Sequence, residues 1–312
     1  MEKVKHVLTY GDVFVDYIAT NTSNTSFNRH LGGATVNVAT GVSGLGVPSE
    51  FITITGDDET STFVRNELLN EGVNLSHAII TPKKRVSGVY IQLTSDFDRV
   101  FASYVNETPD LQVTYEQLKS QSFEDANIFH FCSGTLFHPK ARTTTQKAIE
   151  LAKNNHVICS YDVNIRLLRW ENEELCRQTV CEFLPSADIG KLTKEELAFL
   201  METESFEEGM MRLSRYAIPL VLVTDGENGT YAGFQNQIHH VPEIPVQAVD
   251  TTGAGDAFMA GIIRHVYLFG LPETKQEVIE CTNFGNQMGA LCATKIGALT
   301  AMPRMAEWKK NN

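Results

Sequence analysis

The stretch Asp250-Thr251-Thr252-Gly253-Ala254-Gly255-Asp256-Ala257-Phe258 decides how this chain is interpreted. Gly253 and Gly255 lack a Cβ atom, so the backbone can turn sharply there and bring several N–H groups toward one anion. A helical apolar pattern follows over residues 257–269 and ends before Gly270. A glycine turn that leads into a helix N-terminus predicts an anion site, because the N–H groups and the positive end of the helix dipole point the same way.

Asp256 lies at this predicted anion site. A carboxylate beside a bound phosphate is placed to accept the proton of a substrate hydroxyl group. The alternatives are a plain connecting loop, or an aspartate in the first turn of a helix that only offsets the helix dipole. The turn taken alone does not separate these readings.

The complete nine-residue stretch resembles the second signature of the PfkB (ribokinase-like) carbohydrate kinases. Other parts of the chain are similar to that family in the same order, from about residue 7 to residue 303. They are Gly11-Asp12-Val13-Phe14-Val15-Asp16, Leu31-Gly32-Gly33-Ala34-Thr35-Val36-Asn37-Val38-Ala39, Gly44-Leu45-Gly46, Gly56-Asp57-Asp58, Val223-Thr224-Asp225-Gly226-Glu227-Asn228-Gly229, Asn286, Gly297-Ala298 and Pro303.

The resemblance implies a ribokinase-like α/β fold, in which helices cover both faces of a mostly parallel central sheet and a small β lid is attached. It also implies one kinase domain over residues 1–312, with lid segments near 12–31 and 86–106. The apolar pattern independently favours alternating strands and helices. Strands are predicted over 6–10, 49–54, 126–131, 156–161, 189–192 and 220–224, and helices over 35–45, 61–71, 139–154, 194–201, 206–216, 257–269 and 275–294.

Two segments interrupt this alternation. Residues 20–29 are polar, and residues 88–104 have the alternating pattern of a β-hairpin. We expect them to form the lid, because a kinase must exclude water from the phosphoryl acceptor. Surface elaboration, or an edge used for dimer contacts, would give the same pattern.

Site roles follow from the resemblance, position by position. Asp256 matches the catalytic aspartate, and the backbone of Gly253, Ala254 and Gly255 matches the oxyanion hole. Positions that meet the sugar are matched by Asp16, Gly32, Gly33 and Asn37. Without the resemblance, Asn37 and Asp16 would be ordinary polar groups on a helix and at a strand end.

Residues 160–170 resemble the Asp-x-Asn-x-Arg…Trp stretch of bacterial fructokinases and related hexose or sugar-acid kinases. The resemblance implies that Asp162, Asn164 and Arg166, at its polar positions, bind the substrate. Arg166 offers a planar fork of donors to a phosphate or to the acceptor. The alternative is a solvated loop in which Arg166 forms a salt bridge with Asp162. Phe137 is expected to be either an apolar wall of the site or a core residue.

The nucleotide side is assigned in the same way, to Thr224, Gly226, Gly229, Asn286 and Lys191. Glu196 matches a residue that organises Mg²⁺ through water. Thr193 as N-cap, with Glu196 as its capping-box partner, explains the same residues without a metal. In some relatives the positions of Asp250 and Thr252 offer carbonyl groups to a monovalent cation such as K⁺. The chain has no Gly-x-x-x-x-Gly-Lys-Ser/Thr sequence, so it is not a P-loop enzyme.

Composition limits the partners. The 26 basic and 38 acidic residues give a net charge of −12, which argues against nucleic acid and anionic membranes as partners. The six cysteines lack the spacing of a metal site, so free thiols in a reducing compartment are expected. No stretch approaches the length of a membrane span. We therefore expect a cytoplasmic protein that binds small molecules, with a homodimer through the lid as an option.

Taken together, these resemblances imply an ATP- and Mg²⁺-dependent kinase that converts fructose to fructose 6-phosphate. Ribose is disfavoured because Ala34 replaces the lysine of ribokinases, and Ser133-Gly134-Thr135 stands where they carry a glutamate. Alternatives are 2-keto-3-deoxygluconate or a nucleoside as acceptor, and a non-catalytic sensor on the same fold. A dinucleotide-dependent oxidoreductase is disfavoured, because Gly-x-Gly-x-x-Gly does not follow the first predicted strand.

Overall fold

The computed structural model describes residues 4–95 and 99–311. Its largest element is a nine-stranded sheet with the strand order β15-β14-β13-β12-β11-β10-β1-β4-β6. Neighbouring strands are parallel except at the β13–β14 and β14–β15 pairs, which are antiparallel. The strands are β1 (His6–Tyr10), β4 (Ser49–Ile52), β6 (Val73–Asn74), β10 (Ala126–Cys132), β11 (Ile158–Asp162), β12 (Ile189–Thr193), β13 (Leu220–Thr224), β14 (Thr230–Phe234) and β15 (Gln237–Val241).

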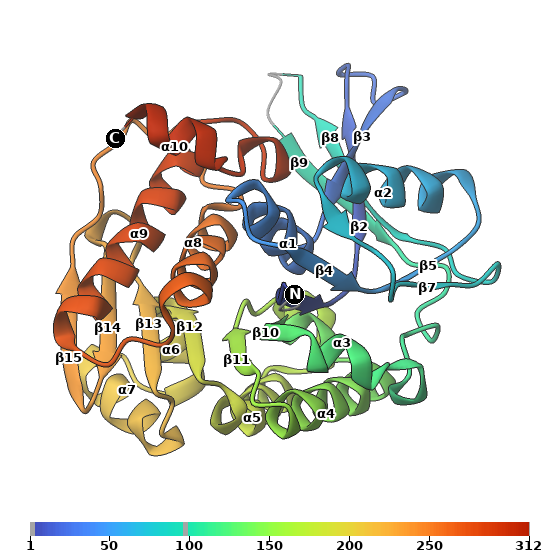
Figure 1. Ribbon diagram of the computed structural model, residues 1–312. Helices are drawn as coiled ribbons and strands as arrows, with labels where there is room; N and C mark the ends of the chain where they lie inside the picture. Colours follow the sequence, from blue (N-terminus) through green and yellow to red (C-terminus); the bar gives the residue numbers. More distant parts are fainter. Residues whose placement is uncertain (1–3, 96–98, 312) are drawn as a thin grey trace.

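Helices cover both faces of this sheet (Figure 1). On one face lie α1 (Ala34–Gly44), α8 (Ala254–Phe269), α9 (Lys275–Ala293) and α10 (Met305–Asn311). On the other lie α3 (Ser120–Glu124), α4 (Pro139–Asn154), α5 (Glu173–Phe183), α6 (Lys194–Met201) and α7 (Phe206–Leu213). Among the described residues, no helix is both long enough and apolar enough to cross a membrane.

Two separate hydrophobic cores result, because successive side chains of a strand point to opposite faces. On β10, Ile128 belongs to the core under α1, α8 and α9, whereas Phe129 and Phe131 belong to the core under α4 to α7. The Phe131 ring stacks on Tyr161 of β11, with ring centroids 4.6 Å apart. Because both faces are covered, nearly every side chain of these strands is buried, including polar ones such as His130 and Ser160.

A smaller sheet of four strands stands beside α1 and α2 (Glu59–Asn70), with the order β3-β2-β8-β9. Its strands are β2 (Phe14–Ala19), β3 (Phe27–Gly32), β8 (Ser87–Leu93) and β9 (Arg99–Val105), and only the β2–β8 pair is parallel. A third core, which includes Val15, Leu31 and Val64, joins this small sheet to α1 and α2. The predicted hairpin over 88–104 is confirmed as the antiparallel pair β8–β9; residues 96–98, at its turn, lie outside the described residues.

The fold class and most of the predicted elements are confirmed, with corrections at several ends. The strand predicted over 156–161 begins only at Ile158, because His156 has a positive φ of 56°. The strand predicted over 49–54 divides into β4 and the short β5 (Ile54–Thr55), which pairs with β7 (Ile79–Ile80). The helix predicted over 206–216 ends at Leu213 and continues as a 3₁₀ turn.

Candidate active site

The site lies at the carboxyl ends of the parallel strands, where α/β sheets usually bind ligands. Asp162 ends β11, Thr193 ends β12 and Thr224 ends β13. The N-termini of α1 and α8 face the same edge, because Asn37 and Asp256 of their first turns are hydrogen-bonded to each other. Residues that are far apart in sequence therefore meet at one place.

The glycine turn of residues 250–258 forms as predicted, but its helix starts three residues earlier, at Ala254. Gly253 caps the helix with φ of 81°, and a Cβ atom there would lie 2.9 Å from the Cβ atom of Ala298. Both the conformation and the close approach therefore require glycine. The N–H groups of Gly255 and Asp256 have no backbone acceptor among the described residues. They remain available to a ligand, as at other helix N-termini that bind anions.

Asp256 is 7% exposed, and other elements hold its carboxylate. Asn37 of α1 donates to its Oδ2 atom at 2.8 Å, and Asn164 of the loop after β11 donates to its Oδ1 atom at 3.4 Å. Burial, together with the nearby Asp162 carboxylate, raises the pKa of Asp256 from its ordinary value to about 7. The Asn37 hydrogen bond and the cations Lys191 and Arg166 oppose this rise. A carboxylate that titrates near neutral pH has the properties of a general base.

A buried ion pair lies next to this carboxylate. Lys191 of β12 donates to both oxygens of Asp162 on β11, at 3.1 and 3.2 Å, and their side chains are 4% and 1% exposed. Burial lowers the pKa of the Lys191 ammonium, but Asp162 and other nearby carboxylates outweigh it, so the net shift is upward. The Nζ atom lies 3.1 Å from the position of a Cβ atom on Gly255. The positive charge of Lys191 is thus fixed beside the glycine turn.

The alternative reading of Arg166 as the salt-bridge partner of Asp162 is wrong. Asp162 pairs with Lys191 instead, because the two residues are register partners on neighbouring strands. The Arg166 side chain is exposed and donates to the carbonyl of Ile165 at 2.9 Å. Its charge still lowers the pKa of Asp256.

Glu196 holds the loop that carries Asn164. Its Oε1 atom accepts from the N–H of Ile165 at 2.7 Å, and its Oε2 atom accepts from the N–H of Thr193 at 2.8 Å. The Thr193 hydroxyl accepts in return from the N–H of Glu196, so the capping box is complete. Burial raises the pKa of this carboxyl group, and Lys191 lowers it. Glu196 therefore has a structural role whether or not it also meets a metal.

Two glycines open the part of the site beside the small sheet. A Cβ atom on Gly32 would lie 2.6 Å from Oδ2 of Asp16, so the Asp16 carboxylate lies directly over Gly32. Gly33 caps α1 with φ of 121°, and a Cβ atom there would lie 3.0 Å from the carbonyl oxygen of Asp12. Burial raises the pKa of Asp16, and His30 lowers it. The missing side chains of Gly32 and Gly33 thus let the Asp16 carboxylate and the Asp12 carbonyl group lie close to the backbone at the start of α1.

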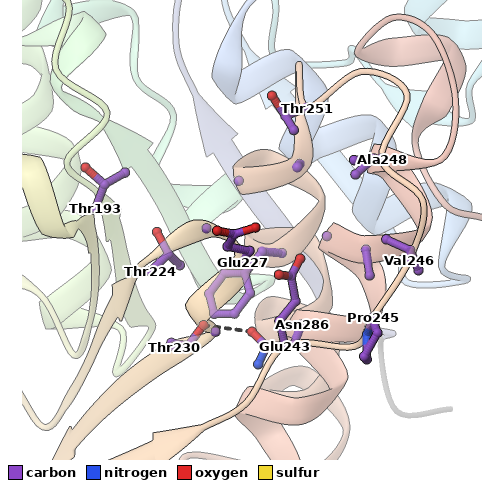
Figure 2. Close-up of a pocket in the computed structure, with 18 of the residues that line it drawn as sticks. Thr193, Thr224, Glu227, Thr230, Glu243, Pro245, Val246, Ala248, Thr251 and Asn286 are labelled. Atoms are coloured by element: carbon purple, nitrogen blue, oxygen red, sulfur yellow. Dashed lines mark hydrogen bonds between the residues drawn. The ribbon is translucent and has the colours of Figure 1, made fainter.

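A cavity of about 840 Å³ adjoins the glycine turn on the side away from the small sheet (Figure 2). Thr224, Gly226, Gly229, Asn286 and Lys191 all line it, as does Gly255. Gly226 and Gly229 both have positive φ, and a Cβ atom on Gly229 would lie 2.4 Å from the carbonyl oxygen of Val241. Much of the remaining wall consists of small or apolar residues, namely Pro245, Val246, Ala248, Phe258, Gly289, Ala290 and Ala293.

The polar atoms of Asn286 are engaged within the protein. Its Oδ1 atom accepts from the Thr230 hydroxyl at 2.7 Å (Figure 2). Its Nδ2 atom donates to the carbonyl oxygens of Val241 and Pro242 at 3.2 and 3.0 Å. Asn286 thus fixes the hairpin strands β14 and β15 onto α9. It lines the cavity without offering a free amide group to a ligand.

Asp250 and Thr252 lie at the start of the glycine turn. Oδ1 of Asp250 accepts from the N–H and the hydroxyl of Thr252 at 2.9 and 2.6 Å, and Oδ2 accepts from the N–H of Gly297 at 2.9 Å. The carboxylate therefore holds two loops together. Among the described residues, no three His, Cys, Asp or Glu side chains are grouped to hold a metal.

One site residue was not predicted from the sequence. Arg169, three positions after Arg166, donates from Nη2 to Oδ2 of Asp12 at 2.7 Å. Its guanidinium carbon lies 3.9 Å from the centroid of the Phe137 ring. Nothing in the local sequence distinguishes it from a solvent-exposed arginine.

The profile of the pfkB family carbohydrate kinases matches residues 4–305. This chain belongs to that family. It is therefore a carbohydrate kinase, a phosphotransferase with an alcohol group as acceptor, and the predicted resemblance is confirmed. Its matched residues include the glycine turn, Asp256 and the paired glycines Gly32 and Gly33 before α1.

Individual relatives place this kinase near the fructokinases. The fructokinase of Klebsiella pneumoniae is 37% identical over 273 residues, which cover 87% of this chain and 88% of that protein. The structure of fructokinase from Vibrio cholerae O395 in fructose, ADP and calcium ion bound form has a TM-score of 0.87 at 29% identity and covers 99% of each chain. The structure of fructokinase with bound ATP from Xylella fastidiosa has a TM-score of 0.89 at 28% identity and covers 99% of this chain and all of that one.

Proposed function

We propose that this kinase transfers the γ-phosphoryl group of ATP to a hydroxyl group of fructose and forms fructose 6-phosphate. The observation that carries the proposal is the position of Asp256, a buried carboxylate with a pKa of about 7 at a helix N-terminus where the N–H groups of Gly255 and Asp256 have no backbone acceptor among the described residues. Similarity to fructokinases, one of them in a fructose and ADP bound form, supports the choice of sugar.

The chemistry requires few groups, because the transition state of phosphoryl transfer is loose and needs mainly positioning and charge stabilisation. The sugar hydroxyl oxygen forms a bond to the γ-phosphorus, the bond from that phosphorus to the β–γ bridging oxygen breaks, and ADP leaves. Asp256 takes the hydroxyl proton. The N–H groups of Gly255 and Asp256 stabilise the negative charge on the transferring group, with Gly253 and Ala254 shaping the turn.

We assign the sugar to the surface formed by Asp16, Gly32, Gly33 and Asn37. Asp16 is a hydrogen-bond acceptor for sugar hydroxyls, and the glycines let the ring approach the backbone. Asn164, which already contacts Asp256, and the exposed Arg166 border this surface from the loop after β11. Asp162 acts from beneath, through its ion pair with Lys191.

We assign ATP to the adjoining cavity, with its phosphates at the glycine turn beside Lys191 and its base toward Asn286, Gly226 and Gly229. Mg²⁺ suits this site as a companion of the nucleotide, because it usually binds substrate phosphates and water together with one or two carboxylates. Glu196 keeps lone pairs beyond its two N–H contacts and is the proposed water-mediated contact. The backbone carbonyls at Asp250 and Thr252 are the proposed place for K⁺.

We also propose that the chain is one kinase domain, in which the small sheet closes over the sugar as a lid. Strand β9 is an edge strand with exposed Val100, Tyr104 and Val105, which supports a homodimer formed through the lid. All six cysteines are free thiols, which supports a cytoplasmic location.

The test is ADP release with Mg·ATP and a panel of fructose, ribose, glucose, 2-keto-3-deoxygluconate, tagatose 6-phosphate and adenosine. We expect one strong response, to fructose. A stronger response to another acceptor would overturn the sugar assignment but keep the reaction. Silence across the panel, together with thermal shifts induced by sugar or ATP, would instead indicate a sensor.

A further inference from the structure

The loop after β11 has an unusual distribution of side chains. Leu168 is 95% exposed, whereas the side chain of the next residue, Arg169, is only 19% exposed. Apolar residues are normally turned inward and arginines outward, so a reversed pair indicates a specific role for the arginine.

Arg169 makes its contacts with two different parts of the fold. Its Nη2 atom donates to Oδ2 of Asp12 at 2.7 Å, and its guanidinium carbon lies 5.1 Å from the centroid of the Phe14 ring. On the other side, the same carbon lies 3.9 Å from the centroid of the Phe137 ring. The cation thus contacts two aromatic rings and is paired with a carboxylate, an arrangement that suits a planar guanidinium better than an ammonium.

The two sides belong to different sheets. Asp12 lies in the short connection between β1 of the large sheet and β2 of the small sheet, and Phe14 is the first residue of β2. Phe137 lies just before α4, which covers the large sheet. Arg169 therefore joins the beginning of the small sheet to the large sheet at the point where the chain passes from one to the other.

The loop that carries Arg169 is itself fixed to the catalytic residues. Five residues earlier, Asn164 contacts Asp256, and the N–H of Ile165 is held by Glu196. On the side of the small sheet, Asp16 lies two residues after Phe14 on β2. A chain of contacts thus runs from Asp256, through this loop and Arg169, to the strand that carries Asp16.

We propose that Arg169 is a positioning residue for the acceptor sugar, which keeps Asp16 of the small sheet in register with Asp256. The inference rests on the proposed function, in which Asp16 binds the sugar and Asp256 takes its proton. Loss of the contact would leave the nucleotide cavity unchanged, because Arg169 does not line it. The effect should therefore fall on the sugar and not on ATP.

The test compares Arg169→Met, which keeps an unbranched side chain without the charge, with Arg169→Lys, which restores the charge. Leu168→Ala, in the same turn but exposed, is the matched control. We expect Arg169→Met to raise KM for the sugar about 10-fold or more with KM for ATP within about 2-fold, since a small misplacement of a bound reactant has large effects. Arg169→Lys should recover part of the loss, and Leu168→Ala should behave as the unchanged protein does. Equal sugar KM values, or a rise in both KM values, would overturn the proposal.

A second measurement separates this inference from the proposed function. Hydrogen exchange of the β2 amides, followed without any ligand, should be faster in Arg169→Met and in Asp12→Asn than in the unchanged protein and in Leu168→Ala. The double variant Arg169→Met/Asp12→Asn should exchange no faster than the faster single variant, because both substitutions remove the same contact between Arg169 and Asp12. Unchanged exchange in β2 would overturn the positioning role whatever the enzyme phosphorylates, whereas silence on every sugar would overturn the proposed function alone.

Discussion

The side-chain amide of Asn37 donates a hydrogen bond of 2.8 Å to Oδ2 of Asp256, although 219 positions separate the two residues in the chain. The same carboxylate is buried and has a pKa of about 7, which is unusual for an aspartate. A hydrogen bond to the ionised form lowers a pKa, whereas burial raises it. The balance between them leaves a group that exchanges a proton near neutral pH.

Replacing this carboxylate should strongly reduce turnover while preserving binding. Asp256→Asn keeps the size and shape of the side chain but removes its basicity. We expect kcat to fall by about 10²-fold or more, with the Kd values for sugar and ATP within a few-fold. Steady-state ADP release and isothermal titration calorimetry measure the two effects. A kcat equal to that of the unchanged protein would exclude Asp256 as the base.

Protein stability should depend on pH through the same group. The folded pKa of about 7 lies above the ordinary value of 3.8, so the folded protein binds more protons than the unfolded chain between these values. The contribution of Asp256 is thus fully present below about pH 4 and declines by about 1.4 kcal/mol per pH unit until it is lost above about pH 7. Asp256→Asn should accordingly gain stability relative to the unchanged protein as pH rises from 5 to 8. Urea denaturation at each pH measures the difference, and a constant difference would contradict the prediction.

Breaking the buried ion pair from one side should be costly. Lys191→Met leaves the carboxylate of Asp162 buried without its partner, which should cost about 3–5 kcal/mol of unfolding free energy. The double variant with Asp162→Asn should recover most of this stability but not the affinity for ATP, because the charge beside the glycine turn is still missing. Denaturation curves and KM for ATP distinguish the two effects. If the double variant recovers both, Lys191 is a structural residue only.

The sugar side of the site should respond to a single methyl group. The new Cβ atom of Gly32→Ala would lie only 2.6 Å from Oδ2 of Asp16, so the Asp16 carboxylate must move. We expect KM for the sugar to rise about 10-fold or more, with KM for ATP nearly unchanged. Initial rates at varied sugar and varied ATP give both constants. A rise in KM for ATP alone would place the sugar elsewhere.

Asn286 should stabilise the protein without selecting the nucleotide base. Its amide already bonds to Thr230 and to two carbonyl groups, so Asn286→Leu leaves these partners unsatisfied and should cost about 1–3 kcal/mol. The ratio of kcat/KM for ATP and GTP should change less than about 3-fold, because both donors of the amide nitrogen and one acceptor site of its oxygen are already used within the protein. A large change in that ratio would show a direct contact.

The sequence was most informative where function depends on local backbone geometry. The glycine turn before Asp256, and Gly32 with Gly33 before Asn37, are visible because a turn into a helix needs adjacent residues of particular types. The elements packed on both faces of the sheet were also predictable, since α4 and α6 have the boundaries expected from their apolar pattern. The predicted start of the strand at His156 was wrong, because the positive φ of this residue is not an extended conformation and β11 begins two residues later.

Contacts between distant segments could not be predicted in the same way. Lys191 and Asp162 pair because they are register partners on the neighbouring strands β11 and β12. The order of strands in a sheet cannot be predicted from the local sequence of either strand. Arg169 shows the same limit, because its partners Asp12 and Phe137 come from other parts of the chain. Glu196 is the intermediate case: its capping box follows from four adjacent residues, whereas its contact with Ile165 does not.

The close approach of Gly253 and Ala298 has a consequence for the newly made protein. The anion turn rests on a segment that is synthesised after it, and Asp256 itself comes after every strand of both sheets. A ribosome-bound chain that has been synthesised through the last strand, β15, therefore still lacks Asp256 and the segment around Ala298. We therefore expect activity only after the segment around Ala298 has left the ribosomal exit tunnel and packed against the glycine turn.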